Sequence, residues 1–369
     1  MKLFRLALFL LIMTNAAAQD TFNLVVGTYT DKCRSEGIYV YEYNANTAEV
    51  KPKSVTKGVI SPSFLAVSPD KKFIYSVNEN GEKSTISSFK YNKANGKIDF
   101  INKKDSEGDS PCYIIADEKN VITANYGGGS LVVYHRRNDG GLTEAKQVVQ
   151  HTGNSINKER QEKAHVHMVY FSPDKKYVFC NDLGTDKIYI YAYNPDGGSK
   201  TLTLKETIDA KPGSGPRHLV FNPNGIFFYV LHELDASLVA YSYINQKVEK
   251  IQETSLVMPG ATGKNGGADI KFTRDGKYLY ATNRGDANTI SVFKVHSNGM
   301  IKMVQQLPTD GDSPRNLAID PKDNHVLVGH QNSSSISIFK RNKTTGMLED
   351  NCKRIDLCSP VCLVFTEAK

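Results

Sequence analysis

The sequence predicts an all-β fold, a seven-bladed β-propeller whose blades are four-stranded antiparallel sheets. Three observations support this prediction. A block of about fifty residues recurs along the whole chain, each block alternates short apolar runs with polar turns, and the two ends of the chain are incomplete blocks that complement each other. Four strands in a repeat of roughly 45 to 55 residues are typical of a propeller blade.

Each block contains the same elements in the same order. It begins with four or five apolar residues, makes a polar turn such as PDK or RDG, and continues into a run rich in Tyr, Phe, Ile and Val. This order predicts strand, turn, strand. A third apolar run and a more polar fourth run complete the sheet. The six complete blocks begin at Ser61, Ser110, His165, Gly215, Gly266 and Ser313.

The seventh blade is divided between the ends of the chain. Residues 22–44 have the pattern of a second and a third strand without a first, and SPVCLVF from Ser359 has the pattern of a first strand alone. Pairing the two termini in one blade closes the ring and leaves no exposed sheet edge.

The first eighteen residues differ from the rest and predict a secretory signal peptide. Lys2 and Arg5 precede an apolar run over residues 6–13, and Ala16, Ala17 and Ala18 provide the small residues of a cleavage site. The apolar run is shorter than the roughly 20 residues that span a bilayer. We therefore expect an exported protein, periplasmic or secreted, with a signal peptide at 1–18, a single domain at 19–369 and no membrane association after cleavage.

The charge distribution disfavours nucleic acid as a partner. The formal net charge is +7, two charges of which lie in the predicted signal peptide, and the remaining Lys and Arg are scattered over many turns. A mild basic excess favours an anionic substrate only where particular arginines converge. The oligomeric state is left open.

The six cysteines have no CxxC spacing, which disfavours a zinc or dithiol redox site. Export permits disulfides. Cys352 and Cys358 flank the last predicted turn and are candidates for a bridge, whereas Cys180 and Cys362 lie in strand-like runs and are expected to be buried.

Two rings of positions are expected at one mouth of the central channel. In an antiparallel blade the start of the first strand and the end of the second strand lie on the same face. The first ring is Ser63, Cys112, His167, Arg217, Ala268, Arg315 and Val361; the second is Glu79, Tyr126, Leu183, Glu233, Arg284, Gln331 and Tyr29. Packing positions repeat one residue type from blade to blade, but these positions do not, which indicates a functional site.

Several motifs resemble one family. HVH from His165, GPRH from Gly215, HE at His232, NRG from Asn283 and SPRN from Ser313 occur in order along the chain. Together they resemble the seven-bladed propeller lactonases, the family of the cycloisomerase-like 6-phosphogluconolactonases and the carboxy-muconate lactonizing enzyme. The resemblance implies a site without metal or cofactor, with the catalytic positions on His167, Arg217, Glu233 and Arg284.

The residue types suit hydrolysis of a sugar-derived or anionic lactone. Such a reaction needs an activated water, stabilisation of an oxyanion and a proton for the leaving alkoxide. We expect Glu233 to be the base and His167 the acid, with Arg217 and Arg284 binding the oxyanion or a substrate anion. Arginine at the mouth would also repel a divalent cation. The expected substrate-binding residues are Arg315, Gln331, Glu79 and Tyr126.

Two alternatives stay open from the sequence. The same residues suit a lactonizing cycloisomerase of the carboxy-muconate type, in which a carboxylate closes onto an alkene. A secreted, non-catalytic propeller that binds a protein or a glycan through its rim is the second alternative.

Overall fold

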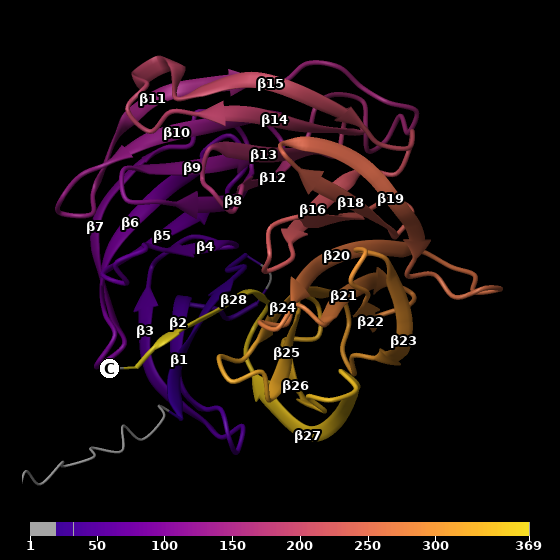
Figure 1. Ribbon diagram of the computed structural model, residues 1–369. Helices are drawn as coiled ribbons and strands as arrows, with labels where there is room; N and C mark the ends of the chain where they lie inside the picture. The colour runs from indigo at the N-terminus through magenta and orange to yellow at the C-terminus, as the bar shows by residue number, and fades with distance from the viewer. Residues whose placement is uncertain (1–19, 32, 369) are drawn as a thin grey trace, which may run out of the picture.

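The computed structural model describes residues 20–31 and 33–368, which form seven four-stranded antiparallel sheets arranged in a ring (Figure 1). The only helical segment in these residues is the short 3-10 helix η1 (Gly198–Lys200), and none is long and apolar enough to cross a bilayer. The predicted fold class is confirmed. The predicted signal peptide at 1–18 lies outside the described residues.

The ring closes as the sequence predicts. One sheet has the order β28 (Pro360–Glu367), β1 (Thr21–Thr28), β2 (Gly37–Asn44) and β3 (Val50–Lys57). β28 pairs antiparallel with β1, from Phe22 opposite Glu367 to Gly27 opposite Cys362. In Figure 1 the yellow strand β28 lies beside the indigo strand β1, at the junction of the two chain ends.

The other six blades follow one another along the chain, and the first strand of each blade lies innermost (Figure 1). Their strands are β4 (Leu65–Val67), β5 (Phe73–Asn78), β6 (Thr85–Asn92) and β7 (Lys97–Asp105); β8 (Pro111–Ala116), β9 (Asn120–Asn125), β10 (Ser130–Arg136) and β11 (Leu142–Gln150); β12 (Val166–Phe171), β13 (Tyr177–Asp182), β14 (Lys187–Tyr193) and β15 (Leu202–Asp209); β16 (Pro216–Phe221), β17 (Phe227–His232), β18 (Ser237–Ile244) and β19 (Lys247–Ser255); β20 (Asn265–Phe272), β21 (Tyr278–Gly285), β22 (Thr289–Val295) and β23 (Ile301–Pro308); β24 (Pro314–Ile319), β25 (His325–His330), β26 (Ser335–Arg341) and β27 (Leu348–Asp356).

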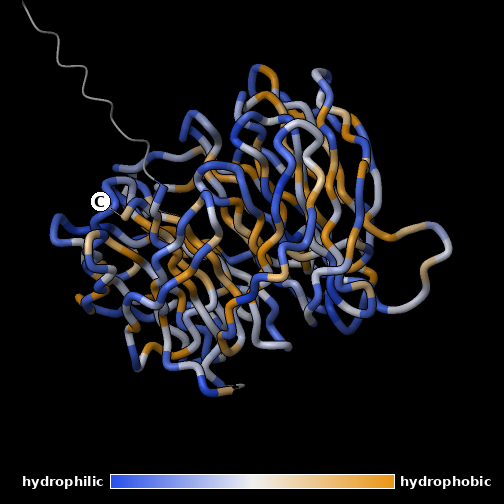
Figure 2. Tube along the Cα trace, turned by 90° about the horizontal axis from the view of Figure 1, so that it is seen from below, coloured by the Kyte–Doolittle hydropathy of each residue, from blue (hydrophilic) through white to orange (hydrophobic). Residues whose placement is uncertain are grey.

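The hydrophobic core lies between neighbouring sheets. Phe179, Phe221 and Phe228 are buried and come from the adjacent blades of β12–β15 and β16–β19, with ring centroids 5.1 to 5.3 Å apart. Aromatic rings at such distances and tilted angles pack favourably. Figure 2 shows the hydrophobic segments along the strands and the hydrophilic ones mainly in the turns and loops. The scaffold is therefore held together blade against blade, which leaves the mouths of the channel to carry polar side chains.

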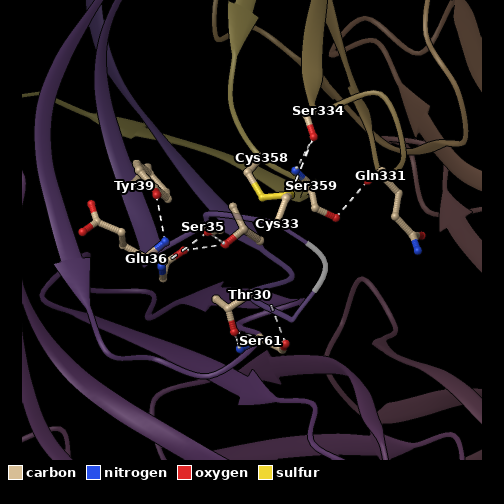
Figure 3. The surroundings of a disulfide bond; sticks show 12 residues. Thr30, Cys33, Ser35, Glu36, Tyr39, Ser61, Gln331, Ser334, Cys358 and Ser359 are labelled. Carbon is tan, nitrogen blue, oxygen red and sulfur yellow. Dashed lines mark hydrogen bonds between the residues drawn. A yellow bond between two sulfur atoms is a disulfide. The ribbon is translucent and has the colours of Figure 1, made fainter.

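A disulfide joins Cys33 to Cys358, with their Cα atoms 5.9 Å apart (Figure 3). The candidate pairing of Cys352 with Cys358 is wrong, because Cys352 is an exposed free cysteine. The reason is the ring closure: Cys358 immediately precedes β28, and Cys33 lies in the loop that follows β1, the strand that pairs with β28. Cys180 and Cys362 are buried free cysteines, as predicted.

Hydrogen bonds extend this closure to the neighbouring blades (Figure 3). Ser359, next to the disulfide, donates its hydroxyl to the carbonyl of Gln331 at 2.9 Å, and its own carbonyl accepts from the Tyr29 N–H at 3.1 Å. The Ser61 N–H donates to the Thr30 hydroxyl at 2.9 Å. The disulfide therefore lies in a bonded region that reaches three blades.

Two histidines of β25 are buried and predict an acid-sensitive fold. Burial lowers the pKa of His325 and of His330 to about 4, so both rings are neutral at pH 7. An unfolded chain, with histidine pKa near 6.5, binds more protons than the folded protein between pH 6.5 and 4, so unfolding becomes easier as the pH falls through this window. Each such histidine contributes a loss of up to about 1.4 kcal/mol per pH unit.

We expect the melting temperature to be nearly constant from pH 8 to 7 and to fall steadily from pH 6.5 to 4.5. His330→Asn, which keeps an N–H donor near the Ser335 carbonyl, should flatten this slope, whereas His296→Asn at an exposed position should not. Thermal unfolding followed by circular dichroism across this pH range measures the effect. An unchanged slope in His330→Asn would contradict the explanation.

Candidate active site at one mouth of the channel

The first predicted ring coincides with irregularities in the innermost strands. In six of them the register with the second strand skips residues, which are left without a pairing partner. A β-bulge of this kind redirects a side chain, here toward the channel. The skipped residues are Cys112, His167, Arg217, Ala268 with Asp269, Arg315 and Val361. In the remaining blade, Ser63 precedes the short strand β4.

Glu233 is the centre of the site. It directly follows β17, and its carboxylate is nearly buried, with 10% of the side chain exposed. One oxygen, Oε2, lies 2.8 Å from Nε of Arg217 and 2.9 Å from a terminal nitrogen of Arg284. The other, Oε1, lies 2.6 Å from a terminal nitrogen of Arg160. Three arginines from different parts of the ring thus converge on one carboxylate.

The backbone of two neighbouring blades fixes Glu233. Its N–H donates to the carbonyl of Gly215 at 2.7 Å, and its carbonyl accepts from the N–H of Gly267 at 3.1 Å. A Cβ atom at Gly267 would lie 2.2 Å from the carbonyl oxygen of His232. Glycine is therefore required there, because β20 passes too close to the end of β17 for any side chain.

The charges in this cluster shift one another's pKa values. Burial opposes ionisation of Glu233, but the charges of Arg284 and Arg217, with Arg160 adding to them, hold the pKa of Glu233 well below its usual range. Burial, with Arg284 adding to the effect, lowers the pKa of Arg217 to about 9, so Arg217 remains protonated at neutral pH. At pH 7 the site holds an ionised carboxylate among guanidinium groups.

His167 lies beside this cluster and is neutral. Its Nε2 is 3.9 Å from Oε2 of Glu233, and its buried Nδ1 has no hydrogen-bond partner among the described residues. Burial, and then the positive charge of Arg217, lower the pKa of His167 well below its ordinary value. The ring of Tyr126 packs edge-on against it at 5.6 Å. The imidazole is therefore neutral, has an unpaired ring nitrogen and lies next to the Glu233 carboxylate, whose charge favours its protonated form against these effects.

Other predicted residues form a second group on the blades around the chain ends. A terminal nitrogen of Arg315 is 3.4 Å from the side-chain oxygen of Gln331, and the guanidinium lies over the ring of Tyr29 at 5.5 Å. The Tyr29 hydroxyl donates to Glu79 at 2.8 Å. The charges of Arg315 and Glu233 interact, so both groups belong to the same mouth. The structure thus brings His167, Arg217, Glu233 and Arg284 together, with Arg315, Gln331 and Glu79 beside them.

Arg160 was not predicted from the sequence. It lies in residues 151–165, the longest connection between two blades in the described chain. Its guanidinium also donates to the hydroxyl of Tyr126 at 3.1 Å. The base of the loop is fixed by His151, which contacts Asp182 at 2.9 Å and the Tyr191 hydroxyl at 2.6 Å. The length of this connection and its run of charged residues were the only signals available for it.

A cavity of about 660 Å³ opens over this cluster. Its volume lies within the range of small-molecule sites. Glu233 and Arg284 line it together with Arg160, and the polar side chains of Asn157, Lys264 and Asn332 contribute to the wall. The cavity therefore gives a small polar ligand access to Glu233 and Arg284, whereas Arg217 and His167 are not among its lining residues.

The arrangement suits acyl chemistry on a polarised carbonyl. Fixed guanidinium donors can stabilise a developing oxyanion, and a neutral imidazole can take a proton from water. Between residues 20 and 368, Lys32 excepted, no group of three or more His, Cys, Asp or Glu side chains is arranged to hold a metal ion.

The comparison with sequence families gives one match that covers nearly the whole ring. The family described as "Lactonase, 7-bladed beta-propeller" matches residues 23–365. Among curated proteins, 6-phosphogluconolactonase of Formosa agariphila is 35% identical over 333 residues, covering 88% of this chain and 94% of the relative. The 6-phosphogluconolactonase of Bacillus subtilis is 32% identical over 345 residues, covering 92% and 97%.

A solved structure has the same architecture. The periplasmic gluconolactonase of Pseudomonas aeruginosa superposes with a TM-score of 0.90 at 32% sequence identity, covering 95% of this chain and all of that protein. The shared fold therefore extends over the complete ring.

Proposed function

Because the chain belongs to the lactonase family of seven-bladed β-propellers, we propose that it hydrolyses a sugar-derived lactone, as a 6-phosphogluconolactonase-like enzyme, at the arginine-lined mouth of its channel. The observation that carries the proposal is Glu233, whose carboxylate meets Arg217, Arg284 and Arg160 next to a neutral, partly unpaired His167.

Arg217 and Arg284 bind the oxyanion. A guanidinium has five N–H donors in a fixed plane. Arg284 donates three of its N–H groups to Glu233 and to the carbonyls of Gly266 and Gly267. Its side chain also lines the cavity, where a substrate can reach it. When water attacks the lactone carbonyl, the negative charge moves to the carbonyl oxygen, where donors held in place beforehand lower the barrier most.

The charges around the site favour His167, and not Glu233 as the sequence predicted, as the base that takes the proton from water. Glu233 is a weak base because three guanidiniums stabilise its ionised form. His167 is neutral at pH 7 and has an unpaired ring nitrogen, so it takes the proton from the attacking water, although burial and Arg217 lower its pKa too. The imidazolium so formed is stabilised by Glu233, 3.9 Å away, and returns the proton to the ring oxygen when the acyl C–O bond breaks. Glu233 then has a second role, which is to hold the arginines in position.

We also propose that the reaction needs no metal. The donor atoms at the mouth are mainly guanidinium nitrogens, which repel a divalent cation, and Glu233 is already saturated by them. The substrate is expected to be a lactone of a sugar acid, with or without a phosphate.

Export is part of the same proposal. We propose that residues 1–18 are a signal peptide and that residues 19–369 form a single domain. Two observations support an oxidising location: the disulfide between Cys33 and Cys358, and the similarity to a periplasmic gluconolactonase.

A panel of lactones tests the activity. Six-carbon sugar lactones, phosphorylated and unphosphorylated, are incubated with the purified protein in the presence of EDTA, and acid release is compared with spontaneous hydrolysis. We expect turnover that resists the chelator and falls at least 100-fold in Arg284→Ala, roughly the weight of one oxyanion contact. It should also fall strongly in Glu233→Gln, which removes the charge that holds the arginines and stabilises the imidazolium. Absence of turnover on every lactone by folded protein would overturn the proposal.

A further inference from the structure

A buried pair of residues lies directly behind Arg217 and has no part in the mechanism above. Arg217 and His218 are consecutive on β16, where the bulge places both side chains in contact. A terminal nitrogen of Arg217 lies 3.2 Å from Nε2 of His218, and Nδ1 of His218 lies 2.8 Å from Asp269 on the next inner strand, β20. His218 is 3% exposed and Asp269 is fully buried.

The partners of His218 determine its protonation. A guanidinium can only donate, so Nε2 must accept from Arg217; an ionised carboxylate can only accept, so Nδ1 must carry the proton. Burial and the charge of Arg217 lower the pKa of His218 to about 3, which agrees with a neutral ring. The hydrogen bonds run in one direction, from Arg217 through His218 to Asp269.

Asp269 is the final acceptor in this series of two hydrogen bonds, and its own position is fixed by several other donors. Burial opposes its ionisation, but Lys271 and His218 hold its pKa below the usual range. Its carboxylate accepts from donors on three inner strands, and β28 joins through the Leu363 N–H, which donates to the side-chain oxygen of Asn316 at 2.7 Å. The donors to Asp269 are Nδ1 of His218, the N–H groups of Ile270 and Leu317, Nζ of Lys271 and Nδ2 of Asn316.

We propose that His218 is a positioning residue for the lactonase reaction: anchored by Asp269, it accepts a hydrogen bond from Arg217 and so fixes the plane in which that guanidinium meets Glu233 and the oxyanion. The inference rests on the proposed function. The effect of His218 on the oxyanion is exerted through Arg217; its ring also packs edge-on against His167, with the ring centroids 5.4 Å apart.

Such a role predicts a particular kinetic result. Misalignment of a donor that acts mainly on the transition state lowers kcat and leaves KM almost unchanged. Two substitutions separate the two hydrogen bonds of His218. His218→Gln puts an acceptor oxygen where Nε2 faces Arg217, whereas His218→Asn keeps a donor near Nδ1 for Asp269 but cannot reach Arg217.

We expect His218→Asn to lower kcat by roughly 10- to 100-fold, the weight of one charge-assisted buried hydrogen bond, with KM changed by less than about 3-fold. His218→Gln should keep kcat within about 5-fold of the unmodified protein. If His218 served only to hold Asp269 and the inner strands, the order would be reversed, with His218→Gln the weaker enzyme and the less stable protein. That reversed order would overturn the inference.

A second measurement does not depend on turnover. Nitrogen NMR of protein labelled with ¹⁵N-histidine should show the neutral tautomer of His218 protonated at Nδ1 from pH 8 to 5, and Arg217→Lys should shift its Nε2 signal. A ring protonated at Nε2 would overturn the inference whatever the lactone assay shows. Failure of every lactone in the unmodified protein, with the Nδ1–H tautomer present, would instead overturn the proposed activity alone.

Discussion

Arg217→Lys should lower kcat/KM for the lactone by about 10²- to 10³-fold while the protein stays folded. Arg217 is 1% exposed, and its Nε contacts Glu233 at 2.8 Å while a terminal nitrogen meets His218. Lysine keeps the charge but offers a single ammonium group, which cannot bind a carboxylate, an imidazole and an oxyanion in one plane. Loss of one such oxyanion contact typically accounts for a decrease of this size.

Arg160→Lys is the matched control, since Arg160 contacts the same carboxylate at 2.6 Å but has 43% of its side chain exposed. Exposed ion pairs contribute little because solvent screens them. We expect a decrease in kcat/KM below about 10-fold, since less than 1.4 kcal/mol is lost. Steady-state kinetics on one lactone measures kcat/KM for the two variants, and thermal unfolding shows whether each variant stays folded. Equal losses in the two variants would contradict the placement of Arg217 at the reacting carbonyl.

Removal of the disulfide should produce the largest loss of stability. Cys33 and Cys358 are separated by 325 residues, so their bond closes almost the entire chain into a loop. In the chain-entropy description, a loop of this length restricts the unfolded state by roughly 4 to 6 kcal/mol. For a protein of this size, such a change corresponds to a decrease in melting temperature of about 5 to 8 °C for Cys33→Ser.

Cys352→Ser is the control, because Cys352 is exposed and unpaired. Its melting temperature should stay within about 1 °C of the unmodified protein, as is usual for an isolated surface substitution. Reducing agent should lower the melting temperature of the unmodified protein and of Cys352→Ser, but not that of Cys33→Ser. Peptide mapping without reduction would identify the bridge directly. A bridge between Cys352 and Cys358, or equal melting temperatures for all variants, would contradict the structure.

The sequence contained most of what the fold required. Repeats with a fixed order of apolar runs predict the blades, and the two incomplete blocks predict the pairing of β1 with β28, because each lacks the strand that the other supplies. Alignment of the repeats also predicted which positions meet at one mouth. The first of its two rings coincides with a bulge that recurs at the same place in six inner strands, even though the residue type at the bulge changes.

Three features lay beyond that alignment. Arg160 lies in a loop that has no counterpart in the other repeats, so its approach to Glu233 depends on tertiary contacts alone. The partner of Cys358 follows from the closed ring and not from proximity along the chain. The protonation of Glu233 and His167 depends on burial among several guanidiniums, which no local pattern of residues encodes.

Because of the bulges, the residues that face the channel mouth are not the residues that form the hydrogen-bonded pairs of the sheets. Each of the seven skipped residues in the six bulged inner strands lies outside the hydrogen-bonded register, so replacing it removes no regular pair from the sheet. Substrate preference can therefore diverge between relatives at these positions without loss of a strand pair, provided that the buried contacts of Arg217 and Asp269 are kept. The same scaffold can in this way acquire new specificities by single substitutions.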